Sequence, residues 1–319
     1  MSTQQIIQSV SEFVSIICEV STCLIKNGID LNEILLFRGH DDEKYKLLPS
    51  VARNIEHTED GAMLKEERNL IDTARYKMPD IFKNDLSPIE LLALLQHHGI
   101  YTRLLDVTSN AFVALYFACC KSPDKNGEVF TFKHNDRCTT NFPFIESIAD
   151  SYRFATEECS IDEFFKYVKK QPYFLEEKYA LKQLQKTDAD IFKNILGVSS
   201  FNEYVIKVLS SPLFIYAPIR SLRQQIQQGL YILFPNNIVY DEKNGEECFE
   251  KIINPISKDH ECIVSRIIVP SEKKTSILEE LKLFGISRET LFGDNTDIVC
   301  SEIVNNIQQK IKGNIPCLT

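Results

Sequence analysis

The sequence predicts an α+β fold in which small β-sheets form a cleft and many helices surround them. Short stretches rich in aromatic and branched residues, such as EILLFRG (33–39) and GEVFTFKH (127–134), are typical of strands. Longer stretches between them, such as residues 3–26, repeat their apolar residues at helical spacing. No internal repeat or low-complexity stretch occurs, so we expect helices and sheets packed in layers around a shared core.

In the first half, residues 3–26 predict an amphipathic helix that ends near Gly28, and residues 33–39 predict a buried strand. Residues 58–76 form a charged helical pattern. The stretch SPIELLALLQHHG (87–99) has complete helix signals: Ser87 as the cap, Pro88 at the first position, Glu90 to complete a capping box, and Gly99 at the end.

The remaining elements follow from the same patterns. After an extended segment at 101–107, Ser109 or Asn110 caps a buried helix that reaches residue 120. Further on we expect these elements in order: a strand at 127–134, a helical region at 145–210, strands at 213–218 and 229–235 around a helix at 219–228, a strand at 261–270, and helices at 271–285 and 296–311. We therefore expect an N-terminal helix (1–28) and one domain (29–319) with a helical insertion around 145–210.

Composition and charge argue against some classes of function. The chain of 319 residues has a net charge of −9, which argues against broad binding to nucleic acid or to an anionic membrane, although a local basic cleft is allowed. No apolar run is long enough to span a bilayer and no basic leader is evident. The ten cysteines lack a disulfide framework, so we expect reduced thiols and a cytoplasmic location.

Several familiar sites are absent from the sequence. There is no Gly-x-x-x-x-Gly-Lys loop, no dinucleotide-binding glycine fingerprint and no His-Glu-x-x-His. His97 and His98 are adjacent, and neighbouring side chains on a helix diverge by about 100°, so they do not suit one metal ion. We therefore expect no metal site and no certain cofactor.

The polar residues after the 87–99 helix have two interpretations. Either His97 or His98, but not both, can satisfy the last carbonyls of the helix, and Arg103 can pair with Asp106 to brace the loop. Alternatively, these groups face a cleft whose floor is the 110–120 helix. The free N–H groups at that helix N-terminus would suit a phosphate or a carboxylate, with hydroxyl groups added by Thr108 and Ser109.

Two further arginine positions remain open. Arg38 ends a predicted strand, where it can either pair with Glu66 or Glu67 in the core or bind an anion. Arg220, Arg223 and Gln227 share one predicted helix face, which is either solvated or packed.

The sequence resembles the FRG domain family, which takes its name from a Phe-Arg-Gly motif. Phe37-Arg38-Gly39, the LLPSVAR stretch (47–53), a glutamate at 66 or 67, QHHGIYTRLLDVT (96–108), and RQQIQQGLYILFP (223–235) match its motifs in order. The resemblance spans about residues 30–310. Val107 stands where the family usually has tryptophan, which removes a stacking role at that position.

A weaker resemblance links the chain to arginine-class ADP-ribosyltransferases, which cleave NAD. It implies that Arg38 holds phosphates and that Thr108 and Ser109 order the nicotinamide side. Those enzymes use a glutamate on a late strand to stabilise the transition state, whereas this chain has Gln228 and Tyr231 there. The resemblance thus implies either an absent or altered activity, or a carboxylate supplied by Asp106 or elsewhere.

Together these arguments give a candidate site that should converge on one cleft. The expected catalytic residues are Arg38, His98, Asp106 and Gln228, and the expected ligand-binding residues are Arg38, Gly39, His97, Arg103, Thr108, Ser109 and Tyr231. NAD is the expected substrate or ligand. Three hypotheses remain: an enzyme acting on NAD, a nucleotide-sensing module without catalysis, and a protein-interaction module whose partner the sequence does not name.

Overall fold

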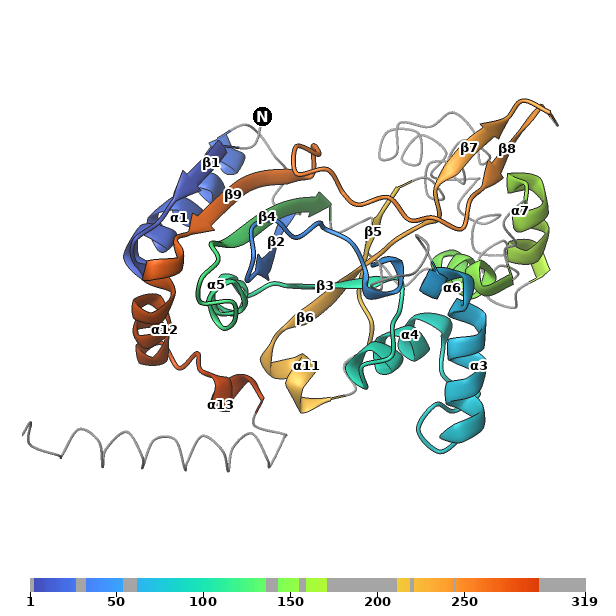
Figure 1. The fold of residues 1–319 in the computed structure, drawn as a ribbon, viewed down its shortest axis with the longest axis horizontal. Coiled ribbons are helices and arrows are strands. Elements are labelled where there is room, and N and C mark those ends of the chain that lie inside the picture. The colour runs from blue at the N-terminus through green and yellow to red at the C-terminus, as the bar shows by residue number, and fades with distance from the viewer. Residues whose placement is uncertain are drawn as a thin grey trace, which may run out of the picture.

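The α+β class is confirmed by a computed structural model, which describes residues 3–26, 33–53, 62–135, 143–154, 159–170, 211–218, 221–243 and 245–292. Seven strands form one mixed sheet (Figure 1), in the spatial order β1 (Thr3–Ile6), β9 (Ile263–Val269), β4 (Gly127–Asn135), β2 (Glu33–His40), β3 (Leu104–Thr108), β6 (Gly229–Leu233) and β5 (Leu213–Ile215). Neighbouring strands are antiparallel, except that β1 runs parallel to β9. A separate hairpin contains β7 (Ile238–Asp241) and β8 (Glu246–Phe249).

The helices lie in two groups at either end of this sheet (Figure 1). One group contains α1 (Val10–Lys26), α5 (Ala111–Cys119) and α12 (Lys274–Leu283), and the other contains α3 (Glu67–Lys77), α4 (Pro88–His97), α6 (Pro143–Ser151) and α7 (Ile161–Lys170). The shorter helical segments are α2 (Ala62–Lys65), α11 (Leu222–Ile226), α13 (Arg288–Leu291), and the 3-10 turns Ser50–Ala52, Tyr152–Phe154 and Ser271–Lys273. None of the described helices has both the length and the apolar character that crossing a bilayer requires.

Alternating side chains divide the core between the two faces of the sheet. On β2, Leu36 packs into the cluster that also holds Val107 and Ile232, whereas Phe37 packs on the opposite face with α1, α5 and α12. Farther along that opposite face, Leu104 and its neighbours pack with α3, α4, α6 and α7. The two helical groups thus cover different halves of the same face of the sheet.

The sheet is weakly joined at its centre. The register between β2 and β3 contains a single residue pair, Phe37 with Thr108, whereas β2 and β4 pair along eight residues from Glu33 to His40. The backbone groups of β3 near Asp106 therefore have no ladder partner on β2. This opening between β2 and β3 positions the candidate site.

Most of the expected elements are confirmed. The helix that begins at Pro88 has the full capping box of Ser87 and Glu90, and Gly99 follows it in the left-handed conformation with φ +79°. Asn110, one of the two expected caps, accepts hydrogen bonds from the backbone N–H groups of Phe112 and Val113.

Other expectations were wrong or incomplete. Residues 3–6 form a strand, because pairing with β9 at the edge of the sheet overrides the helical pattern there. Residues 62–77 form two helices, and the β7–β8 hairpin and α13 were not anticipated. The helix expected at 296–311 and residues 171–210 of the helical insertion lie outside the described residues.

Candidate functional site

A cleft of about 1330 Å³ opens at the junction of β2, β3 and β6. Its polar lining comes from β2 and the following loop, the end of α4, β3, the end of α5, α11, β6, the 252–255 segment and α13. The lining includes Arg38, Gly39, His40, Asp41, Lys44, Tyr45, Lys46, Arg53, Gln96, His97, Asp106, Thr108, Cys120, Lys121, Arg223, Gln224, Gln227, Tyr231, Asn254 and Arg288. Segments far apart in sequence therefore meet at this cleft.

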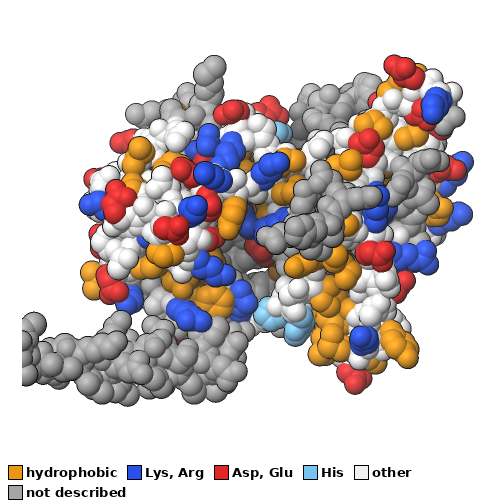
Figure 2. Space-filling view, viewed as in Figure 1, with side chains coloured by type: hydrophobic (Ala, Val, Ile, Leu, Met, Phe, Trp, Pro, Cys, Tyr) orange, Lys and Arg blue, Asp and Glu red, His pale blue; other side chains and the backbone are white. Residues whose placement is uncertain are grey.

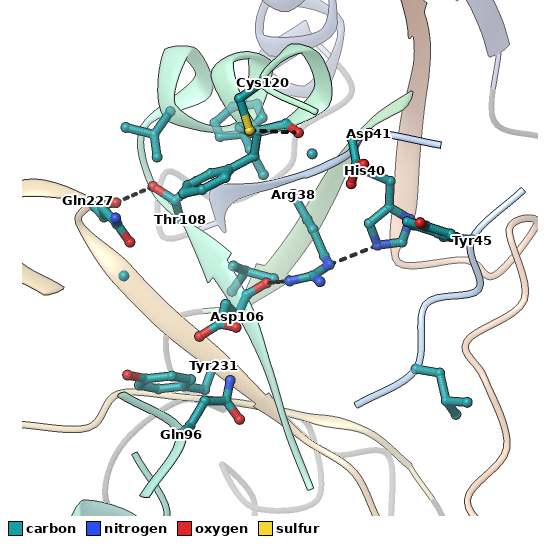
Figure 3. A pocket seen from close by; sticks show the side chains of 18 of the residues that line it. Arg38, His40, Asp41, Tyr45, Gln96, Asp106, Thr108, Cys120, Gln227 and Tyr231 are labelled. Atoms are coloured by element: carbon teal, nitrogen blue, oxygen red, sulfur yellow. Dashed lines mark hydrogen bonds between the residues drawn. The ribbon is translucent and has the colours of Figure 1, made fainter. Parts of the chain in front are cut away.

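Arg38 lies at the centre of the cleft (Figure 3). Its Nε donates to Nε2 of His40 at 2.9 Å, and its Nη1 donates to the backbone carbonyl of Asp106. Burial lowers the pKa of Arg38 to about 10, an effect that Asp106 opposes and Arg53 reinforces. Arg38 therefore remains charged at neutral pH while two neutral acceptors fix its guanidinium group.

His40 is a site residue that the sequence arguments missed. An arginine Nε can only donate, so the Nε2 that faces it must accept, and the imidazole must be neutral with its proton on Nδ1. Burial and the charges of Arg38, Arg53 and Lys258 agree with this, since they lower the pKa of His40 to about 2. His40 thus orients Arg38 without neutralising it. Its position directly after Phe37-Arg38-Gly39 is the signal that could have identified it.

Gly39 lines the cleft, but its lack of a side chain has another explanation. A Cβ atom at this position would lie 1.9 Å from the carbonyl oxygen of Ala114 on α5 and 2.7 Å from the backbone nitrogen of Ala118. Gly127 on β4 meets the same helix, with a Cβ position 2.2 Å from the carbonyl oxygen of Ala118. Both glycines allow α5 to pack directly against the sheet.

Asp106 and Tyr231 face each other across β3 and β6, where they form a register pair. The side chain of Asp106 is exposed in the cleft, whereas Tyr231 is mostly buried. Burial first, and then the charge of Asp106, raise the pKa of Tyr231, while Arg223 opposes the shift. Tyr231 therefore stays protonated at neutral pH and can act as a hydrogen-bond donor.

The groups expected to bind an anion at the N-terminus of α5 have hydrogen-bond partners within the chain. Asn110 already accepts from the first N–H groups of the helix, and Thr108 donates its hydroxyl to the carbonyl of Gln227 at 2.7 Å. Ser109 and Gln228, which are exposed and outside the cleft lining, bond to each other at 3.2 Å. These residues join β3 to the turn before β6, where Gln228 has φ +46°. Gln227, and not Gln228, lines the cleft.

Arg103 neither lines the cleft nor pairs with Asp106, so both expectations for this residue are wrong. Its guanidinium is completely buried, pairs with Glu67, donates to the carbonyl of Phe234 and the side chain of Asn236, and lies 3.9 Å from the centre of the Tyr152 ring. Glu67 is the carboxylate that we considered for Arg38. This buried pair joins α3 to the end of β6 and does not belong to the cleft.

The two adjacent histidines have different surroundings, although their rings meet edge to face with centroids 5.2 Å apart. His97 lines the cleft, with its Nδ1 3.5 Å from the hydroxyl of Ser221, whereas His98 is exposed and packs edge-to-face on Phe82. His98 is therefore outside the cleft, contrary to the expected catalytic role. Within the described part of the chain, no group of three or more His, Cys, Asp or Glu side chains could hold a metal ion.

The cleft is strongly positive although the chain is acidic. Figure 2 shows Lys and Arg side chains around a hollow in this face of the molecule. Only Asp41 and Asp106 among the lining residues are acidic, and the basic ones are Arg38, Lys44, Lys46, Arg53, Lys121, Arg223 and Arg288. None of these seven basic side chains forms an ion pair with a carboxylate of the described residues. They are therefore available to an anionic ligand.

Part of the cleft is formed by a segment of the chain that matches a known family. Residues 33–127, a little under a third of the chain, match the model of the FRG domain. The chain contains an FRG domain. No curated protein and no solved structure matches the chain.

The FRG domain supplies one side of the cleft and the rest of the chain supplies the other. Arg38, Asp106 and Lys121 lie within the matched segment, whereas Arg223 and Arg288 lie beyond it. The cleft is thus complete only when the FRG domain packs against the C-terminal part of the sheet and α11 and α13.

Proposed function

We propose that the cleft binds a phosphate-bearing nucleotide such as NAD, with Arg38 as the principal phosphate ligand. The observation that supports this most strongly is the set of seven basic side chains that line a cleft with two aspartates and form no ion pair with a carboxylate in the described part of the chain. Unpaired arginine is costly to keep in a partly enclosed site unless an anion joins it. A planar guanidinium held by His40 and the Asp106 carbonyl is also preorganised to bond a phosphate through its remaining N–H groups.

The catalytic form of this proposal is cleavage of the bond between nicotinamide and ribose. Asp106 is the carboxylate on β3 beside Arg38, and Tyr231 is a protonated donor opposite it. In this proposal the Asp106 carboxylate stabilises the positive charge that develops on the ribose as nicotinamide leaves, and water or a protein side chain then attacks that ribose carbon. This is the chemistry of an NAD glycohydrolase or an ADP-ribosyltransferase.

A second candidate is a nucleotide-sensing or interaction module without catalysis. It is favoured by β6, which places Tyr231 and no carboxylate in the cleft. In that case the same cations bind the ligand, and no bond is broken.

Two measurements on the full chain separate these proposals. Binding is measured as a rise in melting temperature with NAD, since a ligand at about 100 times its Kd stabilises a protein by roughly 2.7 kcal/mol. Catalysis is measured as nicotinamide release by the wild type and by Asp106→Asn. Stabilisation with release that the substitution abolishes supports the enzyme, and stabilisation without release supports the sensing module. No stabilisation by NAD contradicts both.

A further inference from the structure

The basic residues of the cleft fall into two groups on different elements. Arg38, Lys44, Lys46, Arg53 and Lys121 lie within the FRG domain segment. Arg223 on α11 and Arg288 on α13 form the second group, beyond that segment. We define these as the first and second basic groups.

The order of the strands places the second group apart from Arg38. Arg38 is on β2, Asp106 on the next strand β3, and Tyr231 on the strand after that, β6. Two strand spacings amount to roughly 10 Å. Helix α11 comes directly before β6 in the chain. Asp106 therefore lies between Arg38 and the strand that α11 leads into, and the charge of Arg223 acts on Tyr231 of that strand.

Among the described residues, Arg223 packs on an aromatic ring and forms no ion pair with a carboxylate. Its guanidinium carbon lies 4.5 Å from the centre of the Phe292 ring. Helix α11 is fixed at its start by the Ser221 cap, and at its end by Gln227, whose Nε2 donates to the carbonyl of Leu291 at 3.1 Å. Contacts between α11 and α13 thus bring Arg223 and Arg288 to the same wall.

The size of the cleft allows a ligand that reaches both groups. Its volume of about 1330 Å³ exceeds the roughly 300–1,000 Å³ of most small-molecule pockets. A single phosphate group at Arg38 would leave the second group without an anion.

We infer that Arg223 and Arg288 form a second anion subsite, so that the preferred ligand is a nucleotide with a second phosphate group remote from the one at Arg38. This inference rests on the proposed function, because it takes the Arg38 subsite as occupied by a nucleotide phosphate. It adds a substrate class: nucleotides phosphorylated at two separate positions.

NAD and NADP provide a direct test, because they differ only by a phosphate group on the adenosine ribose, away from the diphosphate. The Kd of each is measured by calorimetry for the wild type and for the double variant Arg223→Gln/Arg288→Gln. We expect the wild type to bind NADP at least tenfold more tightly than NAD, and the ratio to fall to about one in the double variant.

Two controls make the result specific. Arg38→Gln should weaken both nucleotides while the preference for NADP persists. A double variant at exposed positions outside the cleft, Arg68→Gln/Lys282→Gln, removes the same charge and should keep the wild-type ratio.

The remaining outcomes overturn the inference in distinguishable ways. Equal Kd values for NAD and NADP in the wild type, or a preference that survives in the Arg223→Gln/Arg288→Gln variant, contradict the second subsite and leave the proposed NAD binding intact. Failure of the wild type to bind either nucleotide contradicts the proposed function together with the inference.

Discussion

Arg38 shows how a single side chain can be fixed without losing its charge. Its acceptors are a neutral imidazole and a backbone carbonyl, neither of which cancels the positive charge as a carboxylate would. Arg103 shows the opposite arrangement, because Glu67 neutralises it in the core. The two arginines thus have different roles, and the type of acceptor distinguishes them.

The histidine beside Arg38 predicts a pH effect on stability. The pKa of His40 is lowered in the folded protein, so below its unfolded value of about 6.5 the unfolded chain binds a proton that the folded chain does not. Stability should therefore fall as the pH drops below 6.5. From pH 7 to pH 5, urea unfolding of the wild type should lose roughly 2 kcal/mol more than His40→Gln does, at about 1.4 kcal/mol per pH unit.

The corresponding control removes an exposed histidine, as His98→Gln does. An equal loss of stability in the wild type and in His40→Gln would show that His40 does not have the neutral role assigned to it.

The buried pair of Arg103 and Glu67 predicts a large effect on stability. Glu67→Gln leaves the Arg103 charge in the core without its partner, which should reduce the free energy of unfolding by roughly 3–5 kcal/mol. Glu279→Gln, which breaks the exposed pair with Lys282, should change it by less than about 1 kcal/mol. Equal effects of the two substitutions in chemical denaturation would refute the bracing role of Arg103.

At the level of elements, the close packing of α5 against β2 and β4 determines the shape of the cleft. Two glycines and two alanines meet at this contact, so α5 approaches the sheet backbone directly. Val113, Ala114 and Cys120 on and after this helix consequently reach the cleft lining. The glycine in the Phe-Arg-Gly motif therefore serves packing, whereas the arginine serves the cleft.

This packing predicts different outcomes for two Gly→Ala substitutions. Gly39→Ala places a methyl group 1.9 Å from a carbonyl oxygen, so the helix must move, and we expect a loss of about 3 kcal/mol or more, at the upper end of overpacking effects. Gly229→Ala is the control, because its nearest neighbour would lie 3.7 Å away. Thermal unfolding of both variants measures the difference. Similar melting temperatures for the two would contradict the assigned contact.

Much of the fold was predictable because local signals agree with the tertiary structure. The Pro88 helix has a complete set of capping residues, the strand around Phe37 is a short apolar run that ends in glycine, and the strand around Phe130 has an alternating pattern. The strand at 3–6 was not predictable, because its partner lies about 260 residues away in β9. Pairing of that kind leaves no local pattern in the sequence.

The site was only partly predictable, for a related reason. Motifs identified Arg38, Asp106 and Tyr231, but which side chains enter a cleft depends on strand register and on partners distant in sequence. Arg103 precedes β3, and its buried partner Glu67 lies 36 residues earlier in the chain on α3, so no local pattern shows that its side chain stays out of the cleft. The basic side chains at 44, 46 and 288 carry no motif, Arg53 ends the LLPSVAR motif without having been expected at the site, and only the fold brings these side chains together.

At the level of the whole molecule, an acidic chain encloses a basic cleft, in which we propose that Arg38 binds a nucleotide phosphate. The most direct measurement is calorimetric titration of NAD into the wild type and into Arg38→Lys, which keeps the charge but loses the planar fork. Arg68→Lys, at an exposed position, is the control.

We predict saturable binding to the wild type and to Arg68→Lys, and at least a tenfold weaker affinity for Arg38→Lys. The free energy of unfolding of Arg38→Lys without ligand should stay within about 1 kcal/mol of the wild type, since no carboxylate loses its partner. Unchanged NAD affinity in Arg38→Lys, or no binding to the wild type, would contradict the claim.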